Sequence, residues 1–207
     1  MTEMTAEQVR AAKVAAMGNE LGELCYDLYR EVAWLHVKWQ EYRELFGASR
    51  ERVELLNRAA PAFFGFLQSV LFDDILLHIT RLTDPPRSVG KDNLTVQRLG
   101  ALIQSADLKL RVDKLVEQAK QQSEFARDRR NRWIAHRDLL TARNQNPQPL
   151  AKASRAAVDQ ALAAIRDVMN EVENHYEKAQ VAYEHSIEAL GGAGALVARL
   201  ERSLKGR

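Results

Sequence analysis

Apolar residues recur along most of the chain at alternating steps of three and four, which is the spacing of one face of an α-helix. The first such segment runs from about Thr5 to Phe46, and Gly47 follows it as a helix-ending residue. Its apolar stripe consists of Leu21, Leu24, Leu28, Val32, Leu35, Trp39, Tyr42 and Phe46. One helix cannot bury a stripe of this length by itself, so we expect other helices to pack against it.

A second helical segment is predicted from about Ser49 to Thr83, with Ser49 as its N-cap. Pro61 lies inside it, and because proline lacks a backbone N–H and crowds the preceding turn, we expect a kink or a division into two helices there. The part after Pro61 is the most apolar of the chain and is predicted to cross the core. The run Asp84–Gly90, which contains Pro-Pro and Gly, predicts a loop.

Two further helices are predicted after this loop. Asn93 is the expected N-cap of a short helix that extends to about Gln104. Ser105 or Asp107 is expected to cap the next helix, which continues to about Asp138. The inward face predicted for this helix consists of Leu108, Val112, Leu115, Ala119 and Gln122.

The longest helical pattern runs from Ala151 to Leu190, after a predicted loop at Thr141–Leu150 that is rich in Asn and Pro. At 1.5 Å per residue such a helix is about 60 Å long. Its apolar positions are spaced by about 3.5 residues, which suits antiparallel packing or dimerisation. These positions are Val158, Leu162, Ile165, Met169, Val172, Tyr176, Ala179, Tyr183, Ile187 and Leu190.

Glycine and proline punctuate the chain only in a few places, since 10 Gly and 5 Pro occur in 207 residues. We therefore predict an all-α fold, an antiparallel helical bundle with long N- and C-terminal helices. The bundle is expected to form one domain over residues 1–190, followed by a short basic helical tail at 191–207.

The composition, with 46% hydrophobic and 28% charged residues, is typical of a water-soluble globular protein. Cys25 is the one cysteine, which excludes an internal disulfide and favours a reducing compartment. We expect neither a secretory leader nor an apolar run that approaches membrane-spanning length, and therefore a cytoplasmic protein without a membrane partner. The net charge of +2 does not by itself indicate a nucleic-acid binder. Any such function must be argued from where the charged residues lie in the sequence.

That charge is concentrated in one segment. Between positions 127 and 143 there are six arginines, at 127, 129, 130, 132, 137 and 143, opposed by Asp128 and Asp138. His136 lies among them. The guanidinium group matches phosphate oxygens, and histidine exchanges a proton near neutral pH. Together they can cleave a phosphodiester bond without a metal ion, because histidine moves the proton while arginine stabilises the charge on phosphate.

The segment Arg130-Asn131-Arg132-Trp133-Ile134-Ala135-His136 resembles the signature of the HEPN superfamily (higher eukaryotes and prokaryotes nucleotide-binding). That signature is an arginine, often followed by a polar residue, then a histidine after four to six intervening residues. The runs Ile79–Pro85 and Asn93–Val96 look like the abortive-infection U-type (AbiU2-like) branch of this superfamily.

The resemblance implies a metal-independent endoribonuclease, often a toxin or antiphage effector, whose two subunits pair so that both motifs line one cleft. It assigns phosphate stabilisation to Arg130, acid–base chemistry to His136 and polar positioning to Asn131. We add Arg127, Arg129, Arg132 and Arg137 as candidate RNA-phosphate contacts. RNA, a second copy of the chain and an antitoxin protein are the implied partners, and no cofactor is expected. Some relatives carry a tyrosine two residues after the histidine, where this chain has Asp138.

Helix geometry leaves the arginine that works with His136 open. In an ideal α-helix, six residues place Arg130 about 120° away from His136, whereas Arg129 and Arg132 share its face. Either the helix is distorted here, or a second subunit completes the site, or Arg129 and Arg132 contribute.

Three other residues are supporting candidates. Trp133 could form the wall of a cleft or stack on a base. Asp74 and His78 are four residues apart on the second helical segment, where an internal hydrogen bond is favoured over a metal site, because two ligands do not define one. Asp73 or Asp74 could instead anchor the arginines. No metal site is predicted, and no Gly-rich phosphate loop, metalloprotease motif or Ser-centred hydrolase motif occurs in the sequence.

Two other functions remain open from the sequence. The first is a non-catalytic dimeric module that uses the same arginines to bind RNA, a nucleotide or an acidic partner. The second is a structural oligomer in which carboxylates neutralise the arginines.

Overall fold

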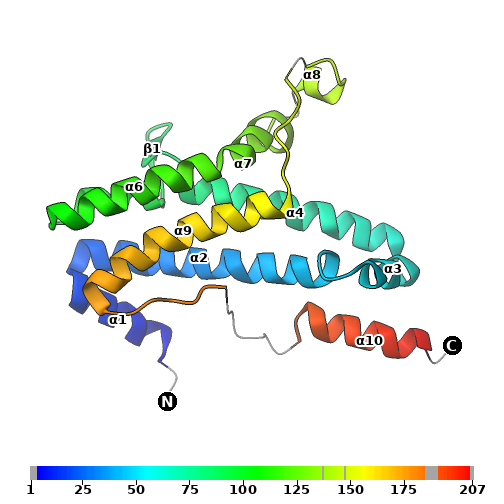
Figure 1. Ribbon diagram of the computed structural model, residues 1–207, viewed down its shortest axis with the longest axis horizontal. Helices are drawn as coiled ribbons and strands as arrows, with labels where there is room; N and C mark the ends of the chain where they lie inside the picture. The colour runs from blue at the N-terminus through cyan, green and yellow to red at the C-terminus, as the bar shows by residue number, and fades with distance from the viewer. Residues whose placement is uncertain (1–3, 137, 147, 185–190, 206–207) are drawn as a thin grey trace. The chain divides into compact units, whose positions relative to one another are not determined.

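Helices make up nearly all the regular structure in the computed structural model, which describes residues 4–136, 138–146, 148–184 and 191–205 (Figure 1). The α-helices are α1 (Ala6–Met17), α2 (Asn19–Phe46), α3 (Arg50–Ala59), α4 (Pro61–Thr83), α5 (Leu99–Leu102), α6 (Ala106–Gln122), α7 (Glu124–Arg129), α8 (Leu139–Ala142), α9 (Arg155–Glu177) and α10 (Ala193–Lys205). A 3₁₀ turn, η1 (Val96–Arg98), and a π-helical turn, η2 (Arg130–Ile134), complete them. The all-α prediction is confirmed.

A small hairpin lies inside the predicted loop after α4. Its strands β1 (Arg87–Ser88) and β2 (Lys91–Asp92) pair antiparallel, with Arg87 opposite Asp92. Val89 and Gly90 form the tight turn between them with positive φ angles of 49° and 77°.

The first predicted helix is divided at Gly18, whose φ of +82° ends α1 before α2 begins. The two helices then approach closely. A Cβ atom at Gly22 would lie 2.6 Å from the Cα of Val14, so only glycine fits at this crossing. Six of the eight predicted stripe positions are buried, namely Leu21, Leu28, Val32, Leu35, Trp39 and Tyr42, whereas Leu24 and Phe46 are half-buried.

Three helix starts follow the sequence and one does not. Ser49 accepts a hydrogen bond from the Arg52 N–H, and α4 begins at Pro61, as predicted. Ser105 caps α6. The predicted cap at Asn93 is wrong, because Thr95 accepts from the Gln97 N–H and caps η1. The Asn93 amide instead donates to the Pro85 carbonyl at 2.8 Å and stabilises the hairpin loop.

The predicted 40-residue C-terminal helix is wrong. α9 ends at Glu177, after 23 residues, which corresponds to about 35 Å. Lys178 has a left-handed φ of 55°, and the Asn170 side chain then bonds to both backbone groups of Val181, at 2.8 and 3.2 Å. These bonds hold the returning chain against α9. The last predicted seam positions, Ile187 and Leu190, lie outside the described residues.

The chain divides into two compact units, of which the first comprises residues 1–32 and 76–181. In its core α6 packs against α9, where Leu108 and Val112 of α6 and Leu162, Ile165 and Met169 of α9 are buried. Within this unit, the buried Lys13 of α1 forms ion pairs with Glu173 at 2.8 Å and Glu177 at 3.0 Å on α9. Burial acts to lower the Lys13 pKa, but the two carboxylates outweigh it and raise that pKa above its ordinary value.

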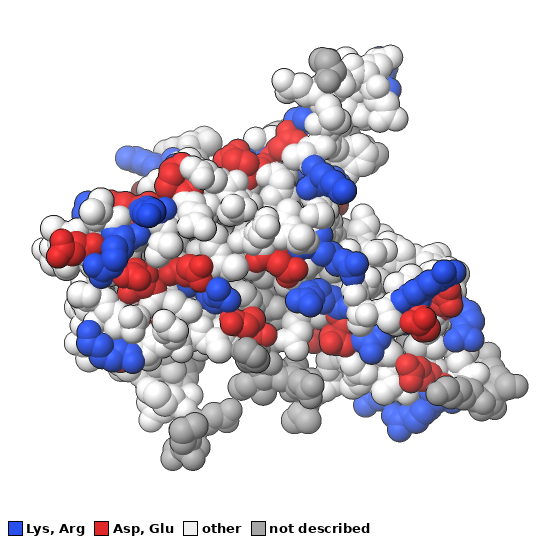
Figure 2. Space-filling model, viewed as in Figure 1, with Lys and Arg blue, Asp and Glu red and all other residues white. Residues whose placement is uncertain are grey.

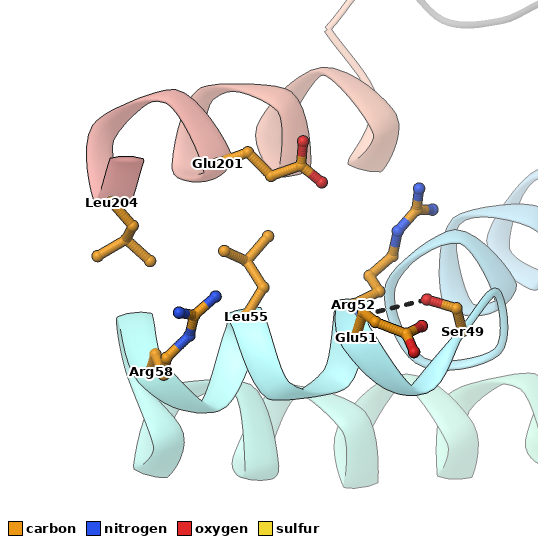
Figure 3. A pocket seen from close by; sticks show the side chains of 7 residues that line it. All are labelled: Ser49, Glu51, Arg52, Leu55, Arg58, Glu201 and Leu204. Atoms are coloured by element: carbon orange, nitrogen blue, oxygen red, sulfur yellow. Dashed lines mark hydrogen bonds between the residues drawn. The ribbon is translucent and has the colours of Figure 1, made fainter. Parts of the chain in front are cut away.

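The second unit comprises residues 33–75 and 182–207. Its core contains Leu45, Leu55, Leu56, Phe64, Ala193 and Val197. The C-terminal tail is thus the packed helix α10, which lies against α3. A cavity of about 270 Å³ between these helices is lined by Leu55 and Leu204 together with the charged side chains of Arg58 and Glu201 (Figure 3).

Helix α4 is long and apolar enough to span a membrane by length and composition alone. Core helices of water-soluble proteins meet the same criteria. The C-terminal part of α4 is buried at Ile75, Leu76 and Ile79, whereas Phe63 and Phe66 near its start are exposed.

Candidate functional site

The arginine-rich segment is not a regular α-helix. After α7 the backbone widens into the π-helical turn η2, in which the Ala135 N–H donates to the carbonyl of Arg130, five residues back, at 2.8 Å. Single π turns of this kind are rare and are frequently found at functional sites. Helical structure ends at Ile134, so His136 lies beyond it. The 120° separation expected for an ideal helix therefore does not apply to Arg130 and His136.

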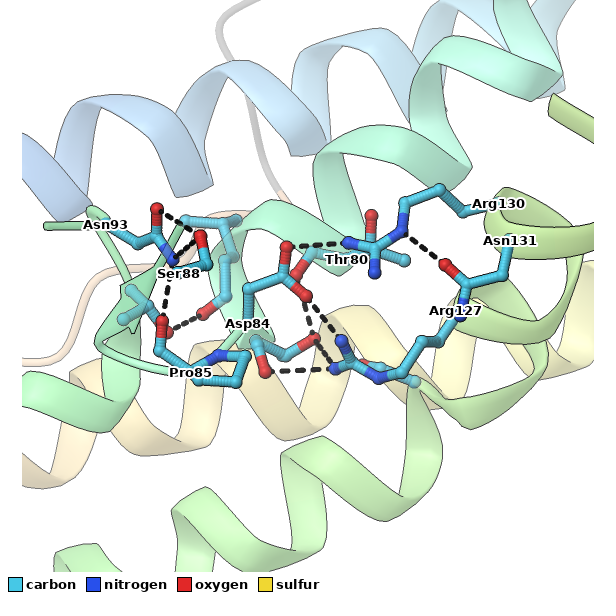
Figure 4. Close-up of polar contacts among 12 residues, drawn as sticks. Thr80, Asp84, Pro85, Ser88, Asn93, Arg127, Arg130 and Asn131 are labelled. Carbon is cyan, nitrogen blue, oxygen red and sulfur yellow. Dashed lines mark hydrogen bonds and ion pairs between the residues drawn. The ribbon is translucent and has the colours of Figure 1, made fainter. Parts of the chain in front are cut away.

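Asp84, immediately after α4, holds two arginines of this segment. Its carboxylate pairs with the Nη1 atoms of Arg127 and Arg130, the latter at 2.6 Å (Figure 4). Both guanidinium groups are mostly shielded from solvent, with exposed fractions of 20% and 25%. Asp84 thus places one negative charge against the two positively charged guanidinium groups.

The two arginines differ in how many of their hydrogen-bond donors are used. Arg127 also donates to the carbonyl and hydroxyl of Thr83, at 3.0 and 3.3 Å, and its Nε faces Glu124 at 3.5 Å. Arg130 uses Nη1 for Asp84 and Nε for the side-chain oxygen of Asn131 at 3.0 Å. Among the described residues, its Nη2 has no acceptor. Arg127 is therefore used for structure, whereas Arg130 is oriented by its neighbours and keeps N–H groups available for an anion.

Arg132 anchors the loop that follows. Its guanidinium donates to Asp128 at 3.0 Å and to the backbone carbonyls of Gln148 and Pro149. It also reaches the Thr141 hydroxyl at 3.3 Å. Arg129 differs, because its Nε is buried and has no hydrogen-bond partner among the described residues.

His136 is exposed and makes no hydrogen bond to a described residue. Arg137 lies outside the described residues. Asp138 caps α8 by accepting from the Thr141 hydroxyl at 2.6 Å and from its N–H at 2.8 Å. These hydrogen bonds, the hydroxyl first, hold the pKa of Asp138 below its usual range. The position where some relatives carry tyrosine therefore has a structural role here.

The remaining candidates have other partners. Asp74 pairs with Lys38 at 2.6 Å, within the second unit. His78 is buried, and its Nε2 lies 2.9 Å from a carboxylate oxygen of Glu31. Asp84 fulfils the anchoring role that the sequence suggested for Asp73 or Asp74. The sequence could have indicated Asp84 by its position, because this acidic residue directly follows the apolar helix and lies within the Ile79–Pro85 run.

Charge is mixed on the one face of the molecule that Figure 2 shows. On the face shown in Figure 2, acidic and basic side chains alternate without forming one large patch. Among the described residues, no three His, Cys, Asp or Glu side chains gather in a way that could hold a metal ion.

Comparison with known proteins gives one result. A family model described as AbiU2, the HEPN_AbiU2 family, matches residues 18–191. A search of curated proteins and a search of solved structures gave no match. The matched range includes Asp84, Arg130, Asn131 and His136.

Proposed function

Because the chain belongs to the AbiU2 family, an abortive-infection-associated branch of the HEPN domains, we propose that it is a metal-independent endoribonuclease and a toxin or antiphage effector. The observation that carries this proposal is the set of hydrogen bonds made by the Arg130 guanidinium. Asp84 and Asn131 fix its guanidinium, and Nη2 remains available for a phosphate oxygen. Positioned donors of this kind stabilise the charge that develops on phosphate in the transition state.

In the proposed reaction His136 takes the proton from a ribose 2′-hydroxyl. The 2′-oxygen attacks the adjacent phosphorus, and the bond from phosphorus to the 5′-oxygen breaks. The leaving oxygen receives a proton from the protonated His136, and the other product ends in a 2′,3′-cyclic phosphate. Arg130 binds the non-bridging oxygens throughout.

The test uses purified protein with labelled structured RNA and single-stranded RNA in EDTA. We expect His136→Ala to lower the cleavage rate by about 10²–10⁴-fold, which is typical for the loss of a general acid–base group. His175→Ala, in the last turn of α9, is the matched control and is expected to cleave normally. Cleavage by His136→Ala at the wild-type rate removes this histidine from the mechanism.

The same cleavage assay is then applied to Arg130→Ala. We expect it to abolish cleavage, while Arg143→Ala, an exposed arginine of the same segment, keeps it. Cleavage that persists in Arg130→Ala but is lost in Arg132→Ala would reassign the phosphate contact to Arg132.

A second candidate function is a non-catalytic module that binds RNA, a nucleotide or an acidic partner. Its supporting observation is that His136 has no hydrogen-bond partner among the described residues to orient its ring, whereas a catalytic base is usually oriented by a third group. Such a module would never cut RNA, and its affinity would fall with each arginine that is removed.

We also propose that the chain forms a homodimer in the cytoplasm and that an antitoxin protein restrains it. Phe63, Phe66 and Val70 on α4, exposed by 57%, 66% and 45%, form an apolar stripe that a second copy could cover. Phe66→Lys is expected to give a monomer in light scattering coupled to size-exclusion chromatography. A monomeric wild-type protein that cleaves RNA would refute the dimer.

A further inference from the structure

A cavity of about 490 Å³ lies beside the η2 turn. Its lining includes Arg129, Arg132 and Trp133 from α7 and the η2 turn, and Asn144, Asn146 and Gln148 from the following loop. This volume falls within the range of small-molecule sites, about 300–1,000 Å³. Arg129, Arg132 and Trp133 belong to the same segment as Arg130 and Asn131.

The walls are held in place by hydrogen bonds within the protein. Arg132 connects Asp128 to the carbonyls of Gln148 and Pro149. Asn146 accepts from the Gln148 N–H at 2.9 Å, and Asp128 accepts from the Ala151 N–H at 2.8 Å. The loop is thereby fastened at both ends, so a ligand would meet a preformed cavity.

The polar groups that remain available match the edge of a nucleobase. Arg129 lines the cavity, and its buried Nε has no hydrogen-bond partner among the described residues, so this guanidinium is not already held by the fold as that of Arg132 is. The side-chain amides of Asn144 and Gln148 are exposed and have no described partner. An amide offers a donor and an acceptor side by side, and unpaired bases in RNA are recognised on such edges.

The charge and the position of the cavity also favour a nucleotide ligand. No Asp or Glu is among the described residues that line it, whereas two arginines and the half-buried Trp133 do. An indole beside a cationic group suits stacking with a base. Trp133 and His136 are three residues apart, so their Cα atoms lie within about 11 Å of each other. An RNA strand whose cleaved phosphate lies at His136 would therefore bring a neighbouring base to this cavity.

We propose that this cavity binds one unpaired nucleobase of the RNA and sets the base preference of cleavage, an inference that rests on the proposed ribonuclease function. Gln148 and Asn144 read the edge of the base, Trp133 stacks on its face, and Arg129 donates to an acceptor atom of the nucleotide. An acidic peptide is the competing ligand.

The first experiment measures binding in the His136→Ala background, so that the RNA stays intact. Fluorescence anisotropy gives Kd values for labelled homopolymeric RNA 8-mers of A, C, G and U at one fixed salt concentration. We expect unequal affinities that Gln148→Ala makes more equal. Gln145→Ala is the matched control, since Gln145 is exposed in the same loop and does not line the cavity.

Trp133→Ala is expected to weaken binding to every homopolymer by about 10-fold or more, and Trp133→Phe to retain most of the affinity. Because Gln148 is an exposed loop residue, its substitution tests the proposal even if Trp133→Ala does not fold. Affinities in Gln148→Ala that equal those in Gln145→Ala overturn the nucleobase site. Binding of a polyglutamate peptide that excludes RNA from the cavity also overturns it.

The second experiment maps the cleavage sites of active protein on an RNA of random sequence in EDTA. Gln148→Ala is expected to cleave with an altered base preference. Cleavage with an unchanged preference overturns the nucleobase site and leaves the ribonuclease standing. Absence of cleavage by wild-type protein, with base-selective binding that depends on Gln148, refutes the nuclease and keeps the site.

Discussion

Replacing Asp84 by asparagine tests the arrangement on which the proposed site depends. The substitution keeps the size of the side chain and removes its charge. Asp84 pairs with both Arg127 and Arg130, and it is 19% exposed, so its charge is only partly screened by water. In Asp84→Asn, two guanidinium groups are left close together without the carboxylate that holds them.

The magnitude follows from these contacts. Hydrogen bonds to charged groups contribute about 1.5–3 kcal/mol each, and two are weakened. Partial exposure lowers this sum, and the amide oxygen of asparagine still accepts one bond. We therefore expect Asp84→Asn to lower the free energy of unfolding by about 2–4 kcal/mol. Because Arg130 loses its orientation, we expect cleavage to fall by about 10–100-fold at temperatures where the variant is folded.

Urea unfolding followed by circular dichroism measures the stability, and the RNA assay measures the rate. Asp92→Asn is the control, because Asp92 pairs with Arg98 at 2.6 Å but is 76% exposed. It is expected to cost less than about 1 kcal/mol. Asp84→Glu, which restores the charge, is expected to recover part of the activity. If Asp84→Asn matches Asp92→Asn in both stability and cleavage rate, the anchoring role of Asp84 is refuted.

Three further predictions concern the first unit and α4. Lys13→Met leaves the buried Glu173 carboxylate without its closest cation, and we expect a loss of about 3–5 kcal/mol in urea unfolding that a second change, Glu173→Leu, largely reverses. Gly22→Ala forces a Cβ atom against the backbone of α1 and is expected to cost about 1–3 kcal/mol, while Gly65→Ala, where nothing lies within 4 Å, is expected to stabilise the protein by about 0.5–1 kcal/mol; equal melting temperatures for the two variants would contradict this. Burial raises the pKa of the Cys25 thiol to about 12, so the thiolate fraction at pH 8 is about 10⁻⁴, and mass spectrometry is expected to detect iodoacetamide labelling only after unfolding.

Local sequence signals were sufficient for most helix starts. Ser49 and Ser105 cap their helices through their own hydroxyl groups, and Pro61 begins α4, because these effects depend on a few neighbouring residues. Failures occurred where a distant contact decides. The apolar spacing continues past Glu177, but the Asn170 side chain binds the backbone of Val181 and directs the chain away from the helical path. The periodicity of apolar residues carries no information about a hydrogen bond between a side chain and a backbone group eleven residues away.

The candidate site divides in the same way. The residue types and the spacing of Arg130, Asn131 and His136 are written in the sequence, and the family match supports the resemblance that they suggested. The sequence could not show that the backbone at Arg130 forms a π turn, because the pattern predicts a continuous helix. It also could not show which arginines are already engaged within the fold.

The sequence by itself thus determined that the chain is helical and that six arginines and His136 are concentrated between Arg127 and Arg143. Tertiary structure alone decided that Asp84, more than forty residues earlier in the chain, holds Arg127 and Arg130, and that Arg132 fastens a loop. The physical reason is that helix periodicity and capping are properties of neighbouring residues. The partner of a charged side chain depends instead on which distant segments the packed core brings within hydrogen-bond distance.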